Sequence, residues 1–329
     1  MKTHVLEKMM AVACALALAV GVMSGAVFAR DEEPVDEPAP PEATFVVLDM
    51  DLGLDASPAD AIDGVELPAD AAETYGYLSS PIEVTDNRSE VPLLVDGQAV
   101  GSCVIVGGVP WVSAEQFCRA VGADVSVQTE GGQLTVSGAV ELSAAADDIY
   151  IICNDRYILV EDGVRCEDGT ILLPVETLAK CFGVSAVWDR VIWTVSVDTE
   201  DGIFPLESGR TFYAETDVYW LSHVIYAEAG NQSLRGQIAV GDVVLNRVAD
   251  PAFAGQNDVY DVIFAKNQFE VVVNGMIYME PSQSAVIAAK LALEGYDVTG
   301  GATYFATFDF GDGYECVCWI EDHCFMIEA

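Results

Sequence analysis

The chain has 329 residues, 52% of them hydrophobic and 20% charged, which suits about two domains and excludes a wholly disordered protein. Asp and Glu number 53 against 14 for Lys and Arg, giving a net charge of −39. Nucleic-acid binding needs Lys and Arg to neutralise phosphates, so this charge argues against nucleic acid as a partner. It argues against an anionic membrane surface for the same reason.

Residues 1–29 have the pattern of a signal peptide. Lys2 and Lys8 begin it, an uncharged apolar stretch follows, and small residues precede a cleavage site after Ala29. We therefore expect an exported protein, secreted or held at the cell wall. An uncleaved N-terminal membrane anchor is the alternative, because the uncharged stretch is just long enough to span a bilayer. A lipoprotein modified at Cys14 fits less well, because the apolar run continues past that residue.

Residues 30–90 are predicted to be an acidic, proline-containing linker. Between residues 31 and 75 there are fourteen Asp or Glu, six prolines and no Lys or Arg. Charge repulsion and stiff prolines keep such a segment extended. We interpret it as a tether without a specific partner.

An internal repeat fills residues 91–199. At an offset of 61 residues, Glu115 matches Glu176 and Gly122 matches Gly183. Each copy predicts a short strand, a short helix that ends at its glycine, and a two-stranded hairpin. The sequence therefore predicts a two-repeat, β-rich α+β module.

Two local signals support this interpretation. Ser113 and Gln116 are spaced as a capping box for the first helix, and Asp96-Gly97 is typical of a type I′ hairpin turn. The module resembles the copper amine oxidase N-terminal, or stalk, domain of secreted Gram-positive proteins. The region contains no histidine, so copper chemistry is not supported. The resemblance implies a structural or wall-associated spacer, and a specific ligand role is the alternative.

Eight cysteines follow the predicted leader, and an exported chain allows them to form disulfides. Five lie in the repeat module and three near the C-terminus: Cys103, Cys118, Cys153, Cys166, Cys181, Cys316, Cys318 and Cys324. Because both numbers are odd, either one bridge joins the two regions or two thiols stay free.

A helix carrying the candidate catalytic residue is predicted from Thr216, as its N-cap, to Gly230. Leu221, Ile225 and Glu228 follow one another at helical spacings, so Glu228 lies on the apolar stripe near the end of the helix. Burial and the negative end of the helix dipole both raise the pKa of a carboxyl group placed there. A glycosidic leaving oxygen requires such a protonated acid. From spacing alone, a hydrogen-bonded structural glutamate is the alternative.

Further helices are predicted at 233–248, 258–264 and 282–293, and a loop or short strand at Gln268-Phe269. Strands are predicted at 300–305, 316–319 and 324–327.

Several ordered blocks then resemble the SleB-type cell wall hydrolase family. They cover about residues 213–325 and read Tyr226-Ala227-Glu228-Ala229, Gly236-Gln237-Ile238-Ala239-Val240-Gly241, Val244-Leu245-Asn246-Arg247-Val248, Gln268-Phe269, Gly300-Gly301-Ala302-Thr303-Tyr304-Phe305 and His323-Cys324-Phe325. We assign residues 212–329 to this domain. The resemblance implies an α+β, lysozyme-like, mainly helical fold with a small β part. It also implies peptidoglycan glycan strands as substrate, no cofactor, and Glu228 as the catalytic residue.

The sequence departs from the family pattern at two positions near these blocks. Gly230-Asn231-Gln232 stands where the family often has Arg-Gly-Glu, and Glu270 stands where it usually has Ser. Neither change removes Glu228.

Hydrolysis of a β-1,4 glycosidic bond usually needs two carboxylates. No motif ties a second one to Glu228, and Asp242 and Glu270 are candidates that we expect to be exposed. A lytic transglycosylase needs one, because the sugar's own 6-hydroxyl replaces water and leaves a 1,6-anhydro-muramyl end. The resemblance points the same way. We therefore predict cleavage between N-acetylmuramic acid and N-acetylglucosamine by a lytic transglycosylase, with a water-using muramidase as the alternative.

Other polar residues of the blocks are candidates for substrate binding. Those predicted to bind sugar or acetamido groups are Gln237, Asn246, Gln268 and Tyr304, and His323 is predicted to orient the substrate. A structural role is the alternative for each. Tyr226 is interpreted as a core residue, and His223 as a surface residue on another face of its helix.

Three other interpretations of the sequence are weaker. Cys316, Cys318, His323 and Cys324 are soft ligands, but their spacing is poor for zinc, so no metal is predicted. A wall-binding protein with an inactive hydrolase domain is opposed by the retained Glu228. An amidase normally needs a metal or a nucleophile, and no motif supplies either.

Overall fold

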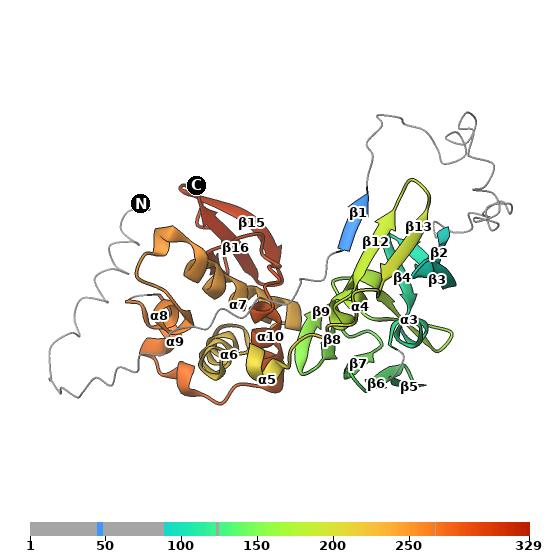
Figure 1. The fold of residues 1–329 in the computed structure, drawn as a ribbon. Helices are drawn as coiled ribbons and strands as arrows, with labels where there is room; N and C mark the ends of the chain where they lie inside the picture. The colour runs from blue at the N-terminus through green and yellow to red at the C-terminus, as the bar shows by residue number, and fades with distance from the viewer. Residues whose placement is uncertain (1–44, 49–88, 123–124, 267) are drawn as a thin grey trace, which may run out of the picture. The chain divides into compact units, whose positions relative to one another are not determined.

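The computed structural model describes residues 45–48, 89–122, 125–266 and 268–329 (Figure 1). The predicted signal peptide and nearly all of the predicted linker lie outside these residues. Among the described residues, no helix is both long and apolar enough to cross a bilayer.

Strands of the repeat module form an eight-stranded sheet with the order β1-β12-β13-β2-β3-β4-β11-β10, in which the edge strand β1 comes from the predicted linker. Most neighbours are antiparallel, but β13 runs parallel to β2, and β1 runs parallel to β12. Its strands are β1 (Phe45–Leu48), β2 (Ser89–Val95), β3 (Gln98–Val106), β4 (Val109–Ser113), β10 (Arg165–Glu167), β11 (Thr170–Pro174), β12 (Ser185–Asp189) and β13 (Thr194–Asp198). Asp96 and Gly97 both have positive φ between β2 and β3, which confirms the predicted tight turn.

The remaining strands of the repeat module form a second, five-stranded antiparallel sheet. It consists, in order, of β5 (Ser126–Glu130), β6 (Gln133–Ser137), β7 (Leu142–Ala145), β8 (Tyr150–Cys153) and β9 (Arg156–Leu159). The two hairpins that the repeat predicts therefore belong to different sheets, because β5–β6 pairs with β7 while β12–β13 pairs with β2.

The two helices of the repeat are α3 (Ala114–Val121) and α4 (Val175–Phe182), whose first residues are 175 − 114 = 61 positions apart. Each ends at its predicted glycine. The capping box is half formed: the Ser113 hydroxyl accepts from the backbone of Gln116, but the Gln116 side chain donates to the carbonyl of Val100. The helices meet through edge-to-face packing of Phe117 on Phe182.

The C-terminal domain is mainly helical, with α6, α7 and α10 at its centre (Figure 1). Its helices are α5 (Gly209–Phe212), α6 (Glu215–Ala229), α7 (Leu234–Ala249), η1 (Pro251–Phe253), α8 (Val259–Phe264), α9 (Glu270–Val273), η2 (Met276–Tyr278) and α10 (Gln283–Leu293). Glycine at 241 lets the three central helices approach, since a Cβ there would lie 3.1 Å from both Ala292 and Ile225. The prediction of Thr216 as N-cap is wrong, because α6 begins at Glu215 and has no side-chain cap.

A small antiparallel sheet covers part of the helices, in the order β14 (Tyr304–Ala306), β16 (His323–Glu328) and β15 (Tyr314–Ile320). Phe325 of β16 is fully buried with Ala239 and Val243 of α7. The predicted α+β class, with a mainly helical C-terminal domain and a small β part, is therefore confirmed.

Candidate catalytic site

Glu228 lies in the last turn of α6, on the side of the helix that bears the buried Leu221 and Ile225. Its side chain is half-buried, whereas Gly230 just beyond it is exposed. The carboxyl group of Glu228 therefore lies at the boundary between the buried core of the domain and the solvent, as the predicted apolar stripe suggests.

Burial raises the pKa of Glu228 to about 7, and the negative charge of Glu270 adds to the increase. Within the described residues, no hydrogen bond or ion pair holds the Glu228 carboxyl group. The group is therefore able to carry a proton near neutral pH, and its oxygens remain available to a ligand. A general acid needs both properties.

Glu270 is the first residue of α9, a short helix that contacts α6. Its side chain is exposed, as predicted. It is the one carboxylate among the described residues whose charge acts on the pKa of Glu228. The family that this domain resembles usually has Ser at this position. The glutamate found here therefore places a negative charge close enough to act on the candidate acid.

Arg247, near the end of α7, brings two of the predicted substrate residues together. Its guanidinium is buried, donates to the carbonyl of Thr303 at 2.6 Å and donates to Oε1 of Gln268 at 2.9 Å. It also lies 5.2 Å from the ring centroid of Tyr304. Gln268 is exposed and Tyr304 is half-buried. Both side chains therefore contact Arg247 and still reach the surface.

Two other candidates use their amides within the protein. Gln237 is buried, accepts from the Ser284 hydroxyl at 2.9 Å and donates to the carbonyl of Gln232 at 3.0 Å. Asn246 donates to the carbonyl of Ala302 at 3.0 Å and fastens the loop before β14 to α7. Both amides shape the domain, and their contact with sugar stays a prediction.

His323 is buried beside Phe305 and Phe325, with ring centroids 5.4 Å and 6.2 Å away. Its Nδ1 has no hydrogen-bond partner among the described residues. Burial lowers its pKa, so the ring is neutral at physiological pH. Its predicted role in orienting substrate remains untested.

Two predictions of exposure are wrong. Asp242 on α7 is buried, accepts from the backbone N–H of Val298 at 2.8 Å, and has its pKa raised by burial to about 8. His223 is buried as well, and its Nδ1 donates to the carbonyl of Ile277 at 2.7 Å. In both cases a distant segment supplies the partner, so the helix sequence alone gives no sign of burial.

Arg247 is the residue that the sequence analysis missed. It lies within the block Val244–Val248, and the sequence alone predicts no role for it. The available signal was an arginine placed among apolar helix residues, because a buried arginine needs partners and usually organises its surroundings.

Two of the four zinc ligands suggested by the sequence are paired with each other in the structure. Cys316 and Cys324 form a disulfide between β15 and β16, which consumes two of the four suggested ligands. The other described cysteines are free thiols, and Cys103, Cys118, Cys153 and Cys181 are buried in the repeat module. The sequence argument, which left at most two free thiols, is therefore wrong: Cys118, Cys153 and Cys181 lie near one another in the core and are not joined in disulfides. No three His, Cys, Asp or Glu side chains of the described residues gather as a metal would require.

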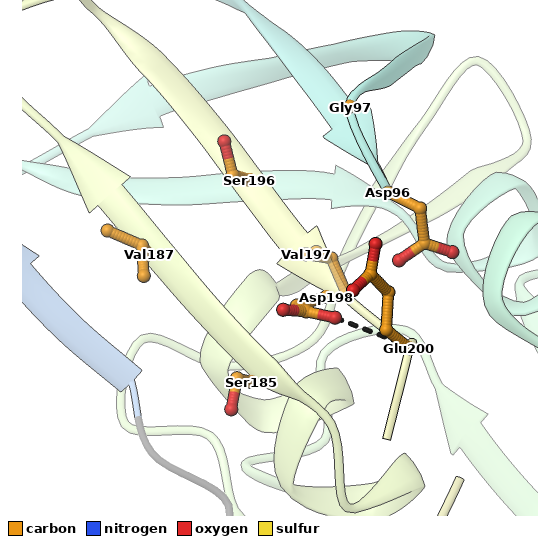
Figure 2. Close-up of a pocket in the computed structure, with 8 residues that line it drawn as sticks. All are labelled: Asp96, Gly97, Ser185, Val187, Ser196, Val197, Asp198 and Glu200. Atoms are coloured by element: carbon orange, nitrogen blue, oxygen red, sulfur yellow. Dashed lines mark hydrogen bonds between the residues drawn. The ribbon is translucent and has the colours of Figure 1, made fainter. Parts of the chain in front are cut away.

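A separate hollow lies on the repeat module, where the turn after β2 meets the ends of β12 and β13 (Figure 2). Three carboxylates line it, from Asp96, Asp198 and Glu200. The Asp96 carboxylate accepts hydrogen bonds from the backbone N–H and the hydroxyl of Thr199. The Asp198 carboxylate accepts one from the backbone N–H of Glu200 (Figure 2). The hollow contains none of the candidate catalytic residues.

Two family models match the chain. Residues 231–326 match the Cell Wall Hydrolase family, and residues 94–197 match the Copper amine oxidase N-terminal domain. The first match begins three residues after Glu228 (231 − 228 = 3), so the assignment of the acid rests on the position and environment of that residue.

Curated relatives match over the same small portion of the chain. A spore cortex-lytic enzyme of Halalkalibacterium halodurans is 40% identical over 93 residues, and one of Bacillus subtilis is 36% identical over 93 residues. Each match covers 28% of this chain, and the matched segment spans 28% and 30% of these relatives.

Solved structures also match this part of the chain. The catalytic domain of the Bacillus cereus SleB protein is 33% identical, with a TM-score of 0.32, over 34% of this chain and 91% of that domain. On the evidence of the family models and the curated relatives, the chain carries a cell wall hydrolase domain, preceded by a copper amine oxidase N-terminal domain.

Proposed function

We propose that this protein degrades peptidoglycan by cleaving the β-1,4 bond between N-acetylmuramic acid and N-acetylglucosamine. The observation that carries the proposal is the carboxyl group of Glu228, half-buried at the end of α6 with a pKa of about 7. The hydrolase family match and the spore cortex-lytic relatives support a wall glycan as the substrate.

In the proposed reaction, the Glu228 carboxyl gives its proton to the glycosidic oxygen as the bond from that oxygen to C1 of the muramic residue breaks. The resulting carboxylate then takes the proton of the sugar's own 6-hydroxyl, and that oxygen bonds to C1. The product carries a 1,6-anhydro-muramyl end, and Glu228 regains its proton. One carboxyl group is therefore sufficient for a lytic transglycosylase.

A water-using muramidase is the second candidate, and Glu270 is the observation that favours it. Its charge acts on Glu228, and its exposed side chain is free to activate a water molecule. A second carboxylate with that role is what hydrolysis requires.

The products of digestion test the proposal. Purified peptidoglycan is treated with the wild-type protein or with Glu228→Gln, and the released fragments are analysed by mass spectrometry. We expect fragments with anhydro ends, each lighter by one water than the hydrolytic product, from the wild type alone. Reducing ends without anhydro products would favour the muramidase, and the absence of any released fragment would refute the enzyme and favour a wall-binding protein.

Export to the cell wall is part of the proposal. It rests on the pattern of residues 1–29, and it agrees with a substrate that lies outside the membrane. The repeat module is proposed as the wall-associated spacer. Edman sequencing of protein recovered from the culture medium would test cleavage, with residue 30 expected at the new N-terminus.

A further inference from the structure

A carboxylate from the small sheet holds the turn that follows the candidate acid. The backbone N–H of Ser233 donates to Oε2 of Glu321 at 2.9 Å. Glu321 lies in the turn between β15 and β16, 88 residues further along the chain. Beside it, the side-chain amide of Gln232 donates to the Asp322 carboxylate at 3.4 Å. Two contacts therefore join the segment between α6 and α7 to one hairpin turn.

The contact with Glu321 completes the N-terminal cap of α7 from outside the helix. Ser233 is the N-cap, and its hydroxyl accepts from the backbone N–H of Gly236 at 3.3 Å. In a capping box, a Glu or Gln three residues after the N-cap accepts in return from the N-cap N–H. That position is occupied here by Gly236, which has no side chain, and Glu321 supplies the missing acceptor. A Cβ at position 236 would lie 3.2 Å from Glu321 Oε2, so glycine avoids crowding this acceptor.

The backbone conformation of Glu321 is unusual for its residue type. Its φ is 50°, in the left-handed region that Gly, Asn and Asp occupy at lower cost. The disulfide between Cys316 and Cys324 closes the same hairpin. A covalently closed turn therefore presents the carboxylate, at a position where glutamate is a less favourable residue. Backbone strain of this kind is associated with functional positions.

Only a short connection separates Ser233 from Glu228. Helix α6 ends at Ala229, and three residues, 230–232, lead from it to Ser233. Within this connection, the backbone N–H of Gln232 donates to the carbonyl of Ala229 at 3.0 Å. The connection is therefore a tight turn with little slack. A displacement of Ser233 is transmitted through it to the last turn of α6, which bears Glu228.

We propose that Glu321 is a positioning residue for Glu228. By fixing Ser233, it keeps the end of α6 in the place from which the Glu228 carboxyl group reaches the glycosidic oxygen. The inference rests on the proposed function for the reaction itself. Glu321 acts through the backbone and not through its charge, because among the described residues it is the charge of Glu270 that acts on the pKa of Glu228.

Three substitutions at position 321 separate the hydrogen bond from the charge. Glu321→Ala removes both, and Glu321→Gln removes the charge but keeps an oxygen for the Ser233 N–H. Glu321→Asp keeps the charge, but its side chain is one methylene shorter and does not reach the N–H. Because Asp tolerates the left-handed backbone, this variant serves if Glu321→Ala does not fold.

Initial rates on solubilised peptidoglycan at several pH values give kcat and KM for each variant. We expect kcat to fall roughly three- to tenfold in Glu321→Ala and Glu321→Asp, with KM within about twofold of wild type. Glu321→Gln should stay within about twofold of wild type in both constants. The alkaline limb of kcat/KM should move to lower pH in the Ala and Asp variants alone, because a loosened turn exposes the Glu228 carboxyl group to water.

Ser282→Ala is the matched control for the loss of a helix cap. It removes the hydroxyl that accepts from the backbone N–H of Ala285 at the start of α10. Thermal unfolding should show a loss of stability similar to that of Glu321→Ala. Its kcat and its alkaline limb should remain those of the wild type, because this cap lies on another helix.

Wild-type kcat and pH profile in both Glu321→Ala and Glu321→Asp would overturn the inference. An equal loss in Glu321→Gln would do the same, since charge would then be responsible, and so would an equal loss in Ser282→Ala, since general destabilisation would then be responsible. Failure of the proposed function is recognised separately, because the wild type then releases no fragments. In that case hydrogen–deuterium exchange of residues 230–236 decides. Faster exchange in Glu321→Ala would support the hold on the turn, and unchanged exchange would refute it.

Discussion

At the scale of single residues, burial, with a contribution from a charged neighbour, sets the pH range in which Glu228 can donate a proton. Burial and the charge of Glu270 both raise the pKa of Glu228, to about 7. A general acid must be protonated in the free enzyme, so kcat/KM should fall as the pH rises through about 7.

Glu270→Gln should move this alkaline limb to lower pH, because removing a negative neighbour makes the Glu228 carboxyl easier to ionise. The measurement is the pH profile of kcat/KM on solubilised peptidoglycan for the wild type and the variant. Glu280→Gln changes the same charge at another position of this region and is the control. A limb that stays in place would show that Glu270 does not act on Glu228, and complete loss of activity would favour Glu270 as a catalytic base.

Asp242 makes a prediction about stability. Burial raises its pKa in the folded protein from an ordinary value of 3.8 to about 8, so the folded state holds a proton that the unfolded state has lost. Between these two values, stability should therefore decrease as the pH rises. Asp242→Asn keeps an oxygen for the Val298 N–H and removes the titration. Urea denaturation at pH 5 and pH 8 should show a smaller loss of stability for the variant, by about 2–4 kcal/mol, because each pH unit between the two pKa values is worth about 1.4 kcal/mol. An unchanged difference would contradict the assignment.

These residues show how far the sequence could predict the site. Glu228 was found because its spacing from Leu221 and Ile225 places it on the buried stripe of one helix. Asp242 and His223 were misjudged because their partners, Val298 N–H and Ile277 carbonyl, come from segments more than 50 residues away. Local patterns contain no information about such contacts.

At the scale of elements, helix starts were predictable wherever a side chain caps them. Ser233, Asp258 and Ser282 each accept from a backbone N–H of the helix that follows, and the predicted starts there are confirmed. The start of α6 was misplaced because no side chain caps it. The short α9 and η2 were not predicted, because helices of three or four residues depend on packing rather than on a periodic pattern.

Arg247 links three elements and makes a prediction at this scale. It ties α7 to Thr303 before β14 and to Gln268 before α9. Lysine cannot reproduce these two directed contacts, so Arg247→Lys should lower the free energy of unfolding by about 1.5–3 kcal/mol. Thermal and urea unfolding measure the change. Arg235→Lys, at an exposed position of the same helix, is the control, and equal stabilities of the two variants would contradict this role.

At the scale of the whole molecule, a buried carboxylate connects the repeat module to the hydrolase domain. Glu294, just after α10, has a fully buried side chain and accepts two hydrogen bonds from Arg156 of β9, at 2.9 and 2.7 Å. Tyr213 donates to the same carboxylate at 2.7 Å, and Phe212 lies 3.5 Å from the guanidinium. The repeat module is therefore joined to the hydrolase domain by specific contacts and not by a linker alone.

Removing Arg156 should be costly, because the buried Glu294 carboxylate loses two close hydrogen bonds and Lys180, whose Nζ lies 3.8 Å away, replaces them incompletely. We expect Arg156→Ala to lower the free energy of unfolding by about 3–5 kcal/mol. Arg119→Ala breaks an exposed pair with Glu115 and should cost at most about 1 kcal/mol. Urea denaturation followed by circular dichroism compares them. Equal losses would show that the Arg156 contact does not hold the two parts together.

This connection was not predictable from the sequence, although the repeat was. The 61-residue offset reproduces α3 and α4, because each copy carries its own turn glycine and apolar pattern. The assignment of the two hairpins to different sheets depends on which strand each meets, and Arg156 and Glu294 are 138 residues apart. Contacts between residues so far apart in the sequence depend on the tertiary packing of the whole chain, which local sequence patterns do not show.

The central claim is that the carboxyl group at position 228 supplies the proton that breaks the glycan strand. The initial rate at which Glu228→Gln solubilises purified peptidoglycan tests it most directly, with Asp242→Asn as a variant of equal charge and with circular dichroism to verify folding. We predict a rate at least about 100-fold below wild type for Glu228→Gln, and a rate close to wild type for Asp242→Asn. A folded Glu228→Gln protein that solubilises peptidoglycan as fast as the wild type would contradict the claim.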